Sequence, residues 1–424
     1  MYENTIAYGR DELWQELADK TTPEISLAMR ELYSLYSDEL IDWFAGLYDI
    51  EIGGYYYSQS ARDNEKTVFN DKEYLLLPDA ESTCQALGFW ASTGMAEKCG
   101  GAYASALPEW MKKDIANYIY NLQDPDGYFY HPQWGKNISL SRRARDFNWS
   151  LSMLKNLGRE PKYPTILDAG KDEKKENGDT LIPDHLSSPE KFQEYLESSN
   201  INERSYNFGN QLSSQFAQIR AMGLDKQLLD FLDAHQHPES GHWHNELNYY
   251  AVNGIMKISG VYNAAGRPLP NAMAAAKSAI YAITSDEEVK AVVDLWNTWI
   301  AVHAMITNLR KFGEDEAAAK IVKTLWDNAP AMIRKSREKI SLFQKEMGSF
   351  SYHKKYASPT SQGAPVTCGY VYEGDVNATV ISSSLLIYSI FNALDIPDLK
   401  IPMFSDSDRL RYIELLENRR KSKQ

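Results

Sequence analysis

Tyrosine and histidine lie close together at three places in this chain of 424 residues. The groups are Tyr130-His131, His244 with Tyr249 and Tyr250, and Tyr352-His353. A tyrosine or histidine within reach of a substrate can act as a general base or as a general acid. The pairs therefore fit β-elimination on a uronic-acid sugar, in which a base removes the C5 proton and an acid protonates the leaving oxygen.

A uronate substrate also carries a carboxylate, which arginine, asparagine or histidine side chains can neutralise. Tyrosine and tryptophan, of which the chain has 27 and 10, provide flat apolar faces for sugar rings. The expected catalytic residues are Tyr250, His244, His242, Glu246, His131 and Asp375. The expected substrate-binding residues are Tyr57, Glu81, Tyr130, Trp134, Arg145, Asn148, Arg204, Asn253, Tyr352 and His353.

Glycoside hydrolysis is the alternative, because two carboxyl groups on either side of a sugar bond can cleave it. The available acids are Asp79, Glu81, Glu246, Glu373 and Asp375. Asp79 and Asp375 could instead cap the N-termini of helices. The spacing of His242, His244 and Glu246 would also suit a metal ion. We nevertheless expect neither a metal nor a cofactor, since no zinc-type set of Asp, Cys and His occurs at a recognisable spacing.

The net charge of −13 argues against nucleic acid as the main partner. Three cysteines without CxxC spacing suit a reducing compartment. The first residues do not resemble a signal peptide, and no apolar run approaches the ~20 residues of a membrane span. We therefore expect a cytoplasmic protein that acts on an oligosaccharide or polysaccharide, and a charged tail that suits a contact in a homo-oligomer.

Apolar residues recur at spacings of three and four along most of the chain, which predicts an all-α protein. Helices are expected near 24–49, 81–98, 108–122, 144–158, 207–222, 225–236, 247–264, 269–282, 286–312, 315–345 and 377–393. No linker divides the chain, so residues 1–424 should form one domain, with a surface insertion near 160–200 and a charged tail helix near 406–422.

A short motif recurs at the ends of three expected helices. Its copies are LQDPDGYF, HQHPESGHW and FQKEMGSF, with a looser copy, YDIEIGGYYY, at 48–57. Each clear copy has Gln, three or four residues, Gly, and an aromatic residue two positions later. The glycines are Gly54, Gly127, Gly241 and Gly348. We expect the glycine to reverse the chain with positive φ and the glutamine to bond turn backbone.

Three of these loops are followed by a long apolar helix with a polar N-terminus, at 77–90, 245–258 and 372–388. The chain would thus repeat the order outer helix, turn, aromatic loop and inner helix. The inner helices would then open at the same end as the loops, with free N–H groups. Residues 55–81, 128–149, 202–211, 242–257 and 351–379 should gather at this mouth.

The Q-x3-4-G-x-aromatic motif resembles the repeat of the terpenoid cyclases and protein prenyltransferases. The resemblance implies an (α/α)6-type toroid, an architecture shared with many polysaccharide lyases and glycoside hydrolases. Class II cyclases carry D-x-D-D-T at an inner-helix start. Here DVNAT (375–379) has Asn377 and Ala378 in place of two acids, while DAEST (79–83) keeps Glu81. These departures favour a sugar enzyme over a cyclase. A toroid that binds without catalysis is the remaining alternative.

Overall fold

The computed structural model describes residues 2–165 and 184–423, and this part of the chain is mostly helical. The expected all-α class is confirmed. Strands occur within the described ranges as three antiparallel hairpins. The strands are β1 (Tyr48–Asp49), β2 (Gly54–Tyr55), β3 (Lys66–Phe69), β4 (Lys72–Leu75), β5 (Thr360–Ser361) and β6 (Ala364–Pro365).

The helices lie close to the ranges that the apolar spacing predicts. They are α1 (Asp11–Lys20), α2 (Pro23–Tyr33), α3 (Glu39–Leu47), α4 (Gln59–Asp63), α5 (Ala80–Ser92), α6 (Tyr103–Ala106), α7 (Glu109–Leu122), α8 (Leu140–Asn156), α9 (Pro189–Glu197), α10 (Ile201–Ala221), α11 (Asp225–His235), α12 (Tyr249–Ala265), α13 (Ala272–Thr284), α14 (Val293–Lys311), α15 (Asp315–Ser341), α16 (Val376–Val380), α17 (Leu386–Ala393) and α18 (Asp406–Ser422). A π-helical turn, η4 (Ile381–Leu385), joins α16 to α17.

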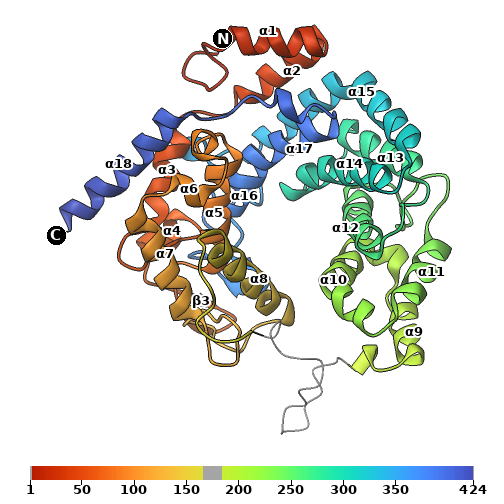
Figure 1. The fold of residues 1–424 in the computed structure, drawn as a ribbon, viewed down its shortest axis with the longest axis horizontal. Coiled ribbons are helices and arrows are strands. Elements are labelled where there is room, and N and C mark those ends of the chain that lie inside the picture. Colours follow the sequence, from red (N-terminus) through yellow and green to blue (C-terminus); the bar gives the residue numbers. More distant parts are fainter. Residues whose placement is uncertain (1, 166–183, 424) are drawn as a thin grey trace.

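One set of helices follows a curve through the molecule (Figure 1). Neighbours along it are α8, α5, the continuous segment from α16 through α17, α14, α12 and α10. Helices α7, α11, α13 and α15 pack against this set from outside, and α2 packs on α15. One apolar core joins both layers, from Ile6 in the N-terminal segment to Leu416 in α18. The curve therefore places the N-terminal turns of several inner helices near one another.

The repeated motif has the structure that its residue types predict. Gly127, Gly241 and Gly348 all have positive φ, between +70° and +88°. A side chain at Gly241 would meet the backbone of Ala275 at 2.3 Å, so this turn has no room for a larger residue. The aromatic residue two positions later is completely buried in every copy. These residues are Phe129, Trp243 and Phe350.

The motif glutamines bond backbone that lies well outside their own turn. Gln123 Nε2 donates to Tyr163 O, and its Oε1 accepts from two backbone N–H groups. Gln236 Nε2 donates to Gly241 O within its own turn, as expected, and also to Pro270 O, 34 residues on. Gln344 Nε2 donates to Leu35 O at 2.7 Å, which ties the last copy to the N-terminal helices. The motif thus connects successive helical hairpins, and it has no chemical role in this geometry.

The structure differs from the sequence-based prediction in three details. The turn glycine of the first copy is Gly53, with φ of +85°, whereas Gly54 lies in β2. The expected helix 24–49 is two helices, α2 and α3, because the chain bends at residues 34–38. The hairpin β3–β4 was not expected, although its turn residues Asn70 and Asp71 are typical of positive φ.

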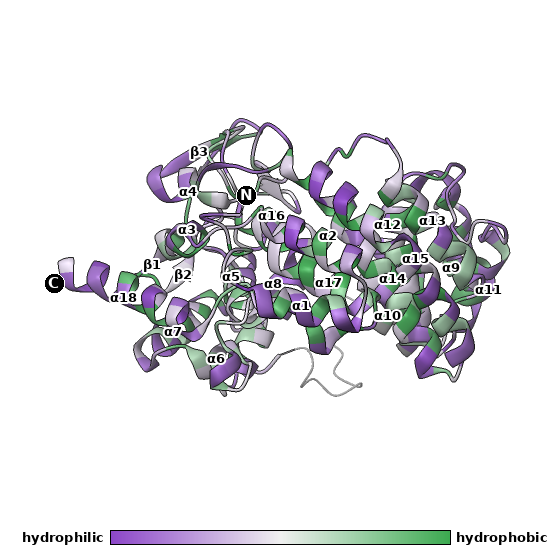
Figure 2. Ribbon diagram, turned by 90° about the horizontal axis from the view of Figure 1, so that it is seen from above, coloured by the Kyte–Doolittle hydropathy of each residue, from purple (hydrophilic) through white to green (hydrophobic). Residues whose placement is uncertain are grey.

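The tail and the insertion near 160–200 are described in part. The tail is the helix α18, which packs on α3 and carries mostly hydrophilic residues (Figure 2). Residues 166–183 of the insertion lie outside the described residues, and α9 belongs to the remainder. Among the described helices, the segment Val376–Ala393 alone is long and apolar enough to cross a membrane, and 78% of it is buried inside the protein.

Candidate functional site

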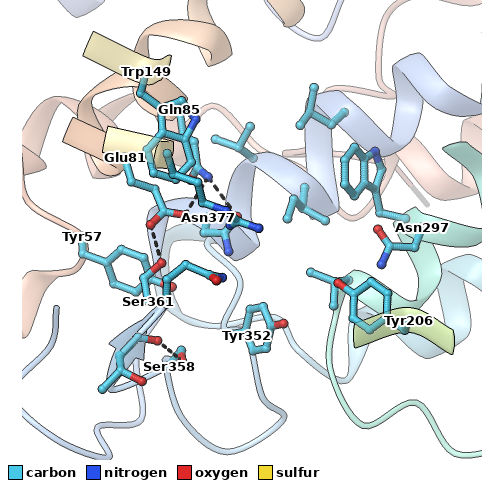
Figure 3. A pocket seen from close by; sticks show the side chains of 18 of the residues that line it. Tyr57, Glu81, Gln85, Trp149, Tyr206, Asn297, Tyr352, Ser358, Ser361 and Asn377 are labelled. Atoms are coloured by element: carbon cyan, nitrogen blue, oxygen red, sulfur yellow. Dashed lines mark hydrogen bonds between the residues drawn. The ribbon is translucent and has the colours of Figure 1, made fainter. Parts of the chain in front are cut away.

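A cavity of about 300 Å³ lies where the inner helices begin (Figure 3). Every inner helix contributes to its wall, and so do two loops that follow motif glycines. The lining residues are Tyr57, Glu81, Gln85, Arg145, Trp149, Tyr206, Lys257, Val293, Trp296, Asn297, Tyr352, Ser358, Thr360, Ser361, Gln362, Asn377, Val380, Ile381 and Leu385. Many of them come from the five segments that should gather at the mouth.

Two cations face this cavity, Arg145 from α8 and Lys257 from α12. Within the described part of the chain, neither forms an ion pair with a carboxylate; Arg145 stacks its guanidinium over Trp149 at 5.9 Å. Burial, together with repulsion from Arg145, lowers the pKa of Lys257 to about 8. Arg145 lies within electrostatic reach of Glu81 but forms no ion pair with it. Two neighbouring cations without an ion-pair partner form a site that an anionic ligand would stabilise.

The acidic side chain Glu81 lies in the cavity wall and is held from behind by Arg142. This arginine is fully buried and donates to Asp79 at 3.1 Å, to Glu81 at 3.0 Å and to Asp146 at 2.9 Å. Ser361 Oγ also donates to Glu81. Burial raises the pKa of Glu81, which Arg142 opposes, and burial raises the pKa of Asp146 to about 7. A single guanidinium therefore holds three carboxyl groups, with Glu81 the member that faces the cavity.

A second buried carboxyl group lies behind the cavity tyrosines. Asp375 caps α16 by accepting from Ala378 N at 2.8 Å, and its other oxygen accepts from Tyr352 N at 2.8 Å. The hydroxyl of Tyr57 lies against the same carboxylate. Burial raises the pKa of Asp375 to about 7, although these donors oppose the rise. Tyr57 belongs to a small buried cluster with Trp134, Ala364 and Val366.

One part of the cavity wall is apolar. It consists of Val293, Trp296, Val380, Ile381 and Leu385. The last two lie in η4, and π-helical turns of this kind occur often at functional sites because they redirect side chains. The opposite part carries amides and hydroxyls, with Gln85 Nε2 donating to Asn377 Oδ1 at 3.1 Å. The cavity thus offers charge, hydrogen bonds and flat apolar surface together.

Four of the sequence-predicted site residues line the cavity. They are Tyr57, Glu81, Arg145 and Tyr352. Asp375 lies directly behind it, and His353 contacts Tyr352 with a ring-centroid distance of 5.0 Å. Asn253 is buried and donates to Asp294 at 2.8 Å, so its amide holds the start of α14. Asn148 and Arg204 are exposed on α8 and α10, away from the cavity lining.

The predicted histidine residues lie outside the lining. His131 is buried, stacks on Trp134 with ring centroids 3.7 Å apart, and has its pKa lowered to about 4 by burial. Tyr130 bonds Asp126. His242 is also buried and faces His237. His244 bonds the backbone of Glu246, which is exposed.

Tyr250 connects this outlying group to the site, because its ring lies 5.8 Å from that of Tyr206, which lines the cavity. Catalytic roles for Tyr250, His244, His242, Glu246 and His131 remain predictions, and the geometry does not bring these side chains into the cavity. The rings of Tyr250, His244, His242 and His131 pack on neighbouring rings instead.

The sequence-based prediction did not include several residues that line the cavity. Lys257 stands in the apolar stretch NGIMKI, where a lone lysine in a buried helix was an available signal. Trp149, Tyr206 and Trp296 gave no such signal, because aromatic residues at helical spacing are also usual in a core. Ser361 lies in the short strand β5, in a segment with no motif.

The described residues contain no cluster of three or more His, Cys, Asp or Glu arranged to hold a metal ion. Comparison of the chain with protein-family models, with curated proteins and with solved structures found no match. The resemblance to the cyclase and prenyltransferase repeat therefore remains a prediction based on the motif.

Proposed function

We propose that this protein is an enzyme that cleaves uronate-containing oligosaccharides by β-elimination. The observation that carries the proposal is the pair Arg145 and Lys257, two cations that face one cavity and form no ion pair in the described chain. Tyrosines, tryptophans and amides surround them, which suits the hydroxyls and the ring faces of a sugar. A carboxylate on that sugar would form ion pairs with both cations.

The cavity side chains support a sequence of proton transfers. Arg145 and Lys257 bind the uronate carboxylate and so make the C5 proton more acidic. The Tyr57 oxygen takes this proton while its own hydroxyl proton passes to Asp375. The C5 electron pair forms the C4=C5 double bond as the C4–O bond breaks. Glu81, whose pKa burial raises, gives its proton to the leaving oxygen.

The alternatives have less support from the cavity. Hydrolysis needs two carboxyl groups facing the sugar bond, and Glu81 is the one acidic side chain in the lining as far as the structure describes it. A cyclase would hold a carbocation, which Arg145 and Lys257 would repel.

We also infer that the curved set of helices and its outer partners form an (α/α)6-type toroid. The order α8, α5, α16–α17, α14, α12 and α10 supports this, as does the bond from Gln344 to Leu35. In that arrangement the cavity would be the mouth of the toroid.

The direct test is incubation with oligomers of different uronic acids, followed by ultraviolet absorbance of the conjugated C4=C5 product. We expect absorbance to rise with at least one oligomer. Tyr57→Phe should lower kcat by about 100-fold or more, the usual contribution of a proton-transfer group. Tyr130→Phe, which changes a tyrosine outside the cavity, is the matched control. New reducing ends without absorbance would contradict elimination and indicate hydrolysis.

Binding of a uronate should weaken as pH rises through the pKa of Lys257. In the protein without ligand, the Lys257 side chain has a pKa of about 8, so the cation that attracts the carboxylate is lost above this pH. We expect Kd for a uronic-acid monosaccharide to rise about tenfold from about pH 7 to about pH 9. Fluorescence of Trp149 and Trp296, which line the cavity, can report binding.

Two variants isolate the lysine in this measurement. Lys257→Met should bind weakly at every pH, and Lys257→Arg should bind without the pH dependence. An unchanged pH profile in Lys257→Met would show that another group titrates.

A further inference from the structure

Residues 351–372 form a hairpin that begins in the cavity wall and ends at the surface. Its strands β5 and β6 pair near the turn, and Ala357 N donates to Val371 O at 3.1 Å farther down. His353 and Tyr356 also pair through their backbones. Thr360 and Ser361 of the hairpin line the cavity. The segment is therefore held in one shape by its own backbone bonds.

Aromatic rings lead along this hairpin away from the cavity. Tyr352 lines the cavity and contacts His353, whose ring lies 4.8 Å from Tyr356. Tyr356 contacts Tyr370 at 5.0 Å. Tyr370 is 75% exposed, so its ring contributes little to the core. Nearby, Tyr372 is 67% exposed and lies under the Lys345 ammonium.

The charge of the hairpin differs from that of the whole protein. Residues 351–372 contain Lys354 and Lys355 and no Asp or Glu, in a chain with net charge −13. Lys354 pairs with Glu288. Lys355 is exposed and forms no ion pair within the described part of the chain. An anionic chain would meet no repulsion from residues of this hairpin.

We propose that the hairpin 351–372 binds further sugar units of an acidic oligosaccharide outside the cavity, with Tyr356 and Tyr370 as stacking surfaces. The proposal rests on the proposed function and adds that the substrate is longer than the cavity. At about 300 Å³ the cavity is at the small end of ligand sites. A longer chain has to leave it, and the ring series from Tyr352 outward is a preformed path.

The test is equilibrium binding of a uronate monomer, a dimer and longer oligomers to the full chain, measured by calorimetry. We expect affinity to increase with length in the wild type. Tyr370→Ala and Tyr356→Ala should each weaken the affinity for long oligomers by about 3- to 10-fold, as expected for the loss of one aromatic contact. Both should leave affinity for the monomer unchanged. Tyr281→Ala is the matched control, because this tyrosine is 60% exposed on α13.

The outcomes separate this proposal from the proposed function. If the monomer binds but Tyr370→Ala and Tyr356→Ala bind long oligomers as the wild type does, the hairpin proposal is wrong and the cavity assignment stands. Weaker monomer binding in Tyr370→Ala would also overturn it, because the ring would then belong to the cavity. If no uronate of any length binds, the proposed function itself fails. Capture of a protein by the hairpin in place of a sugar would contradict the proposal as well.

Discussion

Replacing Arg145 or Lys257 by methionine is expected to lower kcat/KM for a uronate substrate by about 10- to 100-fold, the effect of losing one hydrogen bond to a charged group. Methionine keeps an unbranched apolar stem, so the change removes the charge with little loss of packing. Both cations would contact the same carboxylate, so the two losses should not be additive. The measurement is the steady-state rate of the unsaturated product.

The same variants should not lose stability, and this separates a binding role from a structural one. Arg145 and Lys257 repel each other and form no ion pair in the described chain, although Arg145 is within electrostatic reach of Glu81. Removing the Lys257 charge should therefore leave the free energy of unfolding unchanged or raise it slightly. Removing the Arg145 charge should change it little, because the lost attraction to Glu81 offsets the relieved repulsion. Lys277→Met, on the exposed side of α13, is the control for a simple change of net charge. A variant that lost stability and activity together would contradict a ligand-binding role.

Replacing Arg142 by methionine is expected to destabilise the fold by about 3–5 kcal/mol, because it leaves buried carboxyl groups without their cation. Asp79, Glu81 and Asp146 all bond this one guanidinium. Urea unfolding gives the free energy difference. Arg143→Met is the matched control, since this neighbour on α8 forms no ion pair in the described chain and lies over the Tyr128 ring, a contact worth about 1 kcal/mol or less.

The loss in Arg142→Met should shrink as pH falls. Burial raises the pKa of Asp146 to about 7 and also raises that of Glu81, and removal of the cation raises both further. A carboxyl group whose folded pKa is raised stabilises the fold below its unfolded pKa, and this stabilisation is lost as pH rises through the folded pKa. The variant should therefore be closest to the wild type in acid and farthest from it above about pH 7.

If Arg142→Met does not fold at neutral pH, Asp146→Asn provides the same test. This change removes one carboxylate and keeps the cation, so it should cost much less than Arg142→Met. An equal cost for both variants would show that packing, and not charge, holds this cluster.

Local patterns in the sequence predicted most of the helical structure. Apolar spacing located the long helices, and the Gln and Gly of LQDPDGYF, HQHPESGHW and FQKEMGSF identified the turns. These features depend on neighbours within a few residues, which a sequence displays directly. Asp79 and Asp375 were recognised as possible caps for the same reason, and both cap helices.

The sequence predicted only some of the side chains that meet in the cavity. Tyr57, Glu81, Arg145 and Tyr352 line the cavity as expected, because each follows a turn or begins an inner helix. The histidine pairs did not locate the cavity, since His131 and His242 are buried in packing that no local pattern reveals. Two residues that are adjacent in the chain do not reveal which side chain of a loop will face the cavity.

By itself, the sequence determined the all-α class, the repeated turn and the segments that surround the cavity, because helix periodicity, capping and glycine turns are local properties. Only the tertiary structure decided which side chains meet. Arg145 and Lys257 are 112 positions apart in the sequence, counting from their numbers, and α8 and α12 bring them to one cavity. Their proximity and their lack of an ion pair are properties of that packed arrangement, and no single stretch of the chain shows them.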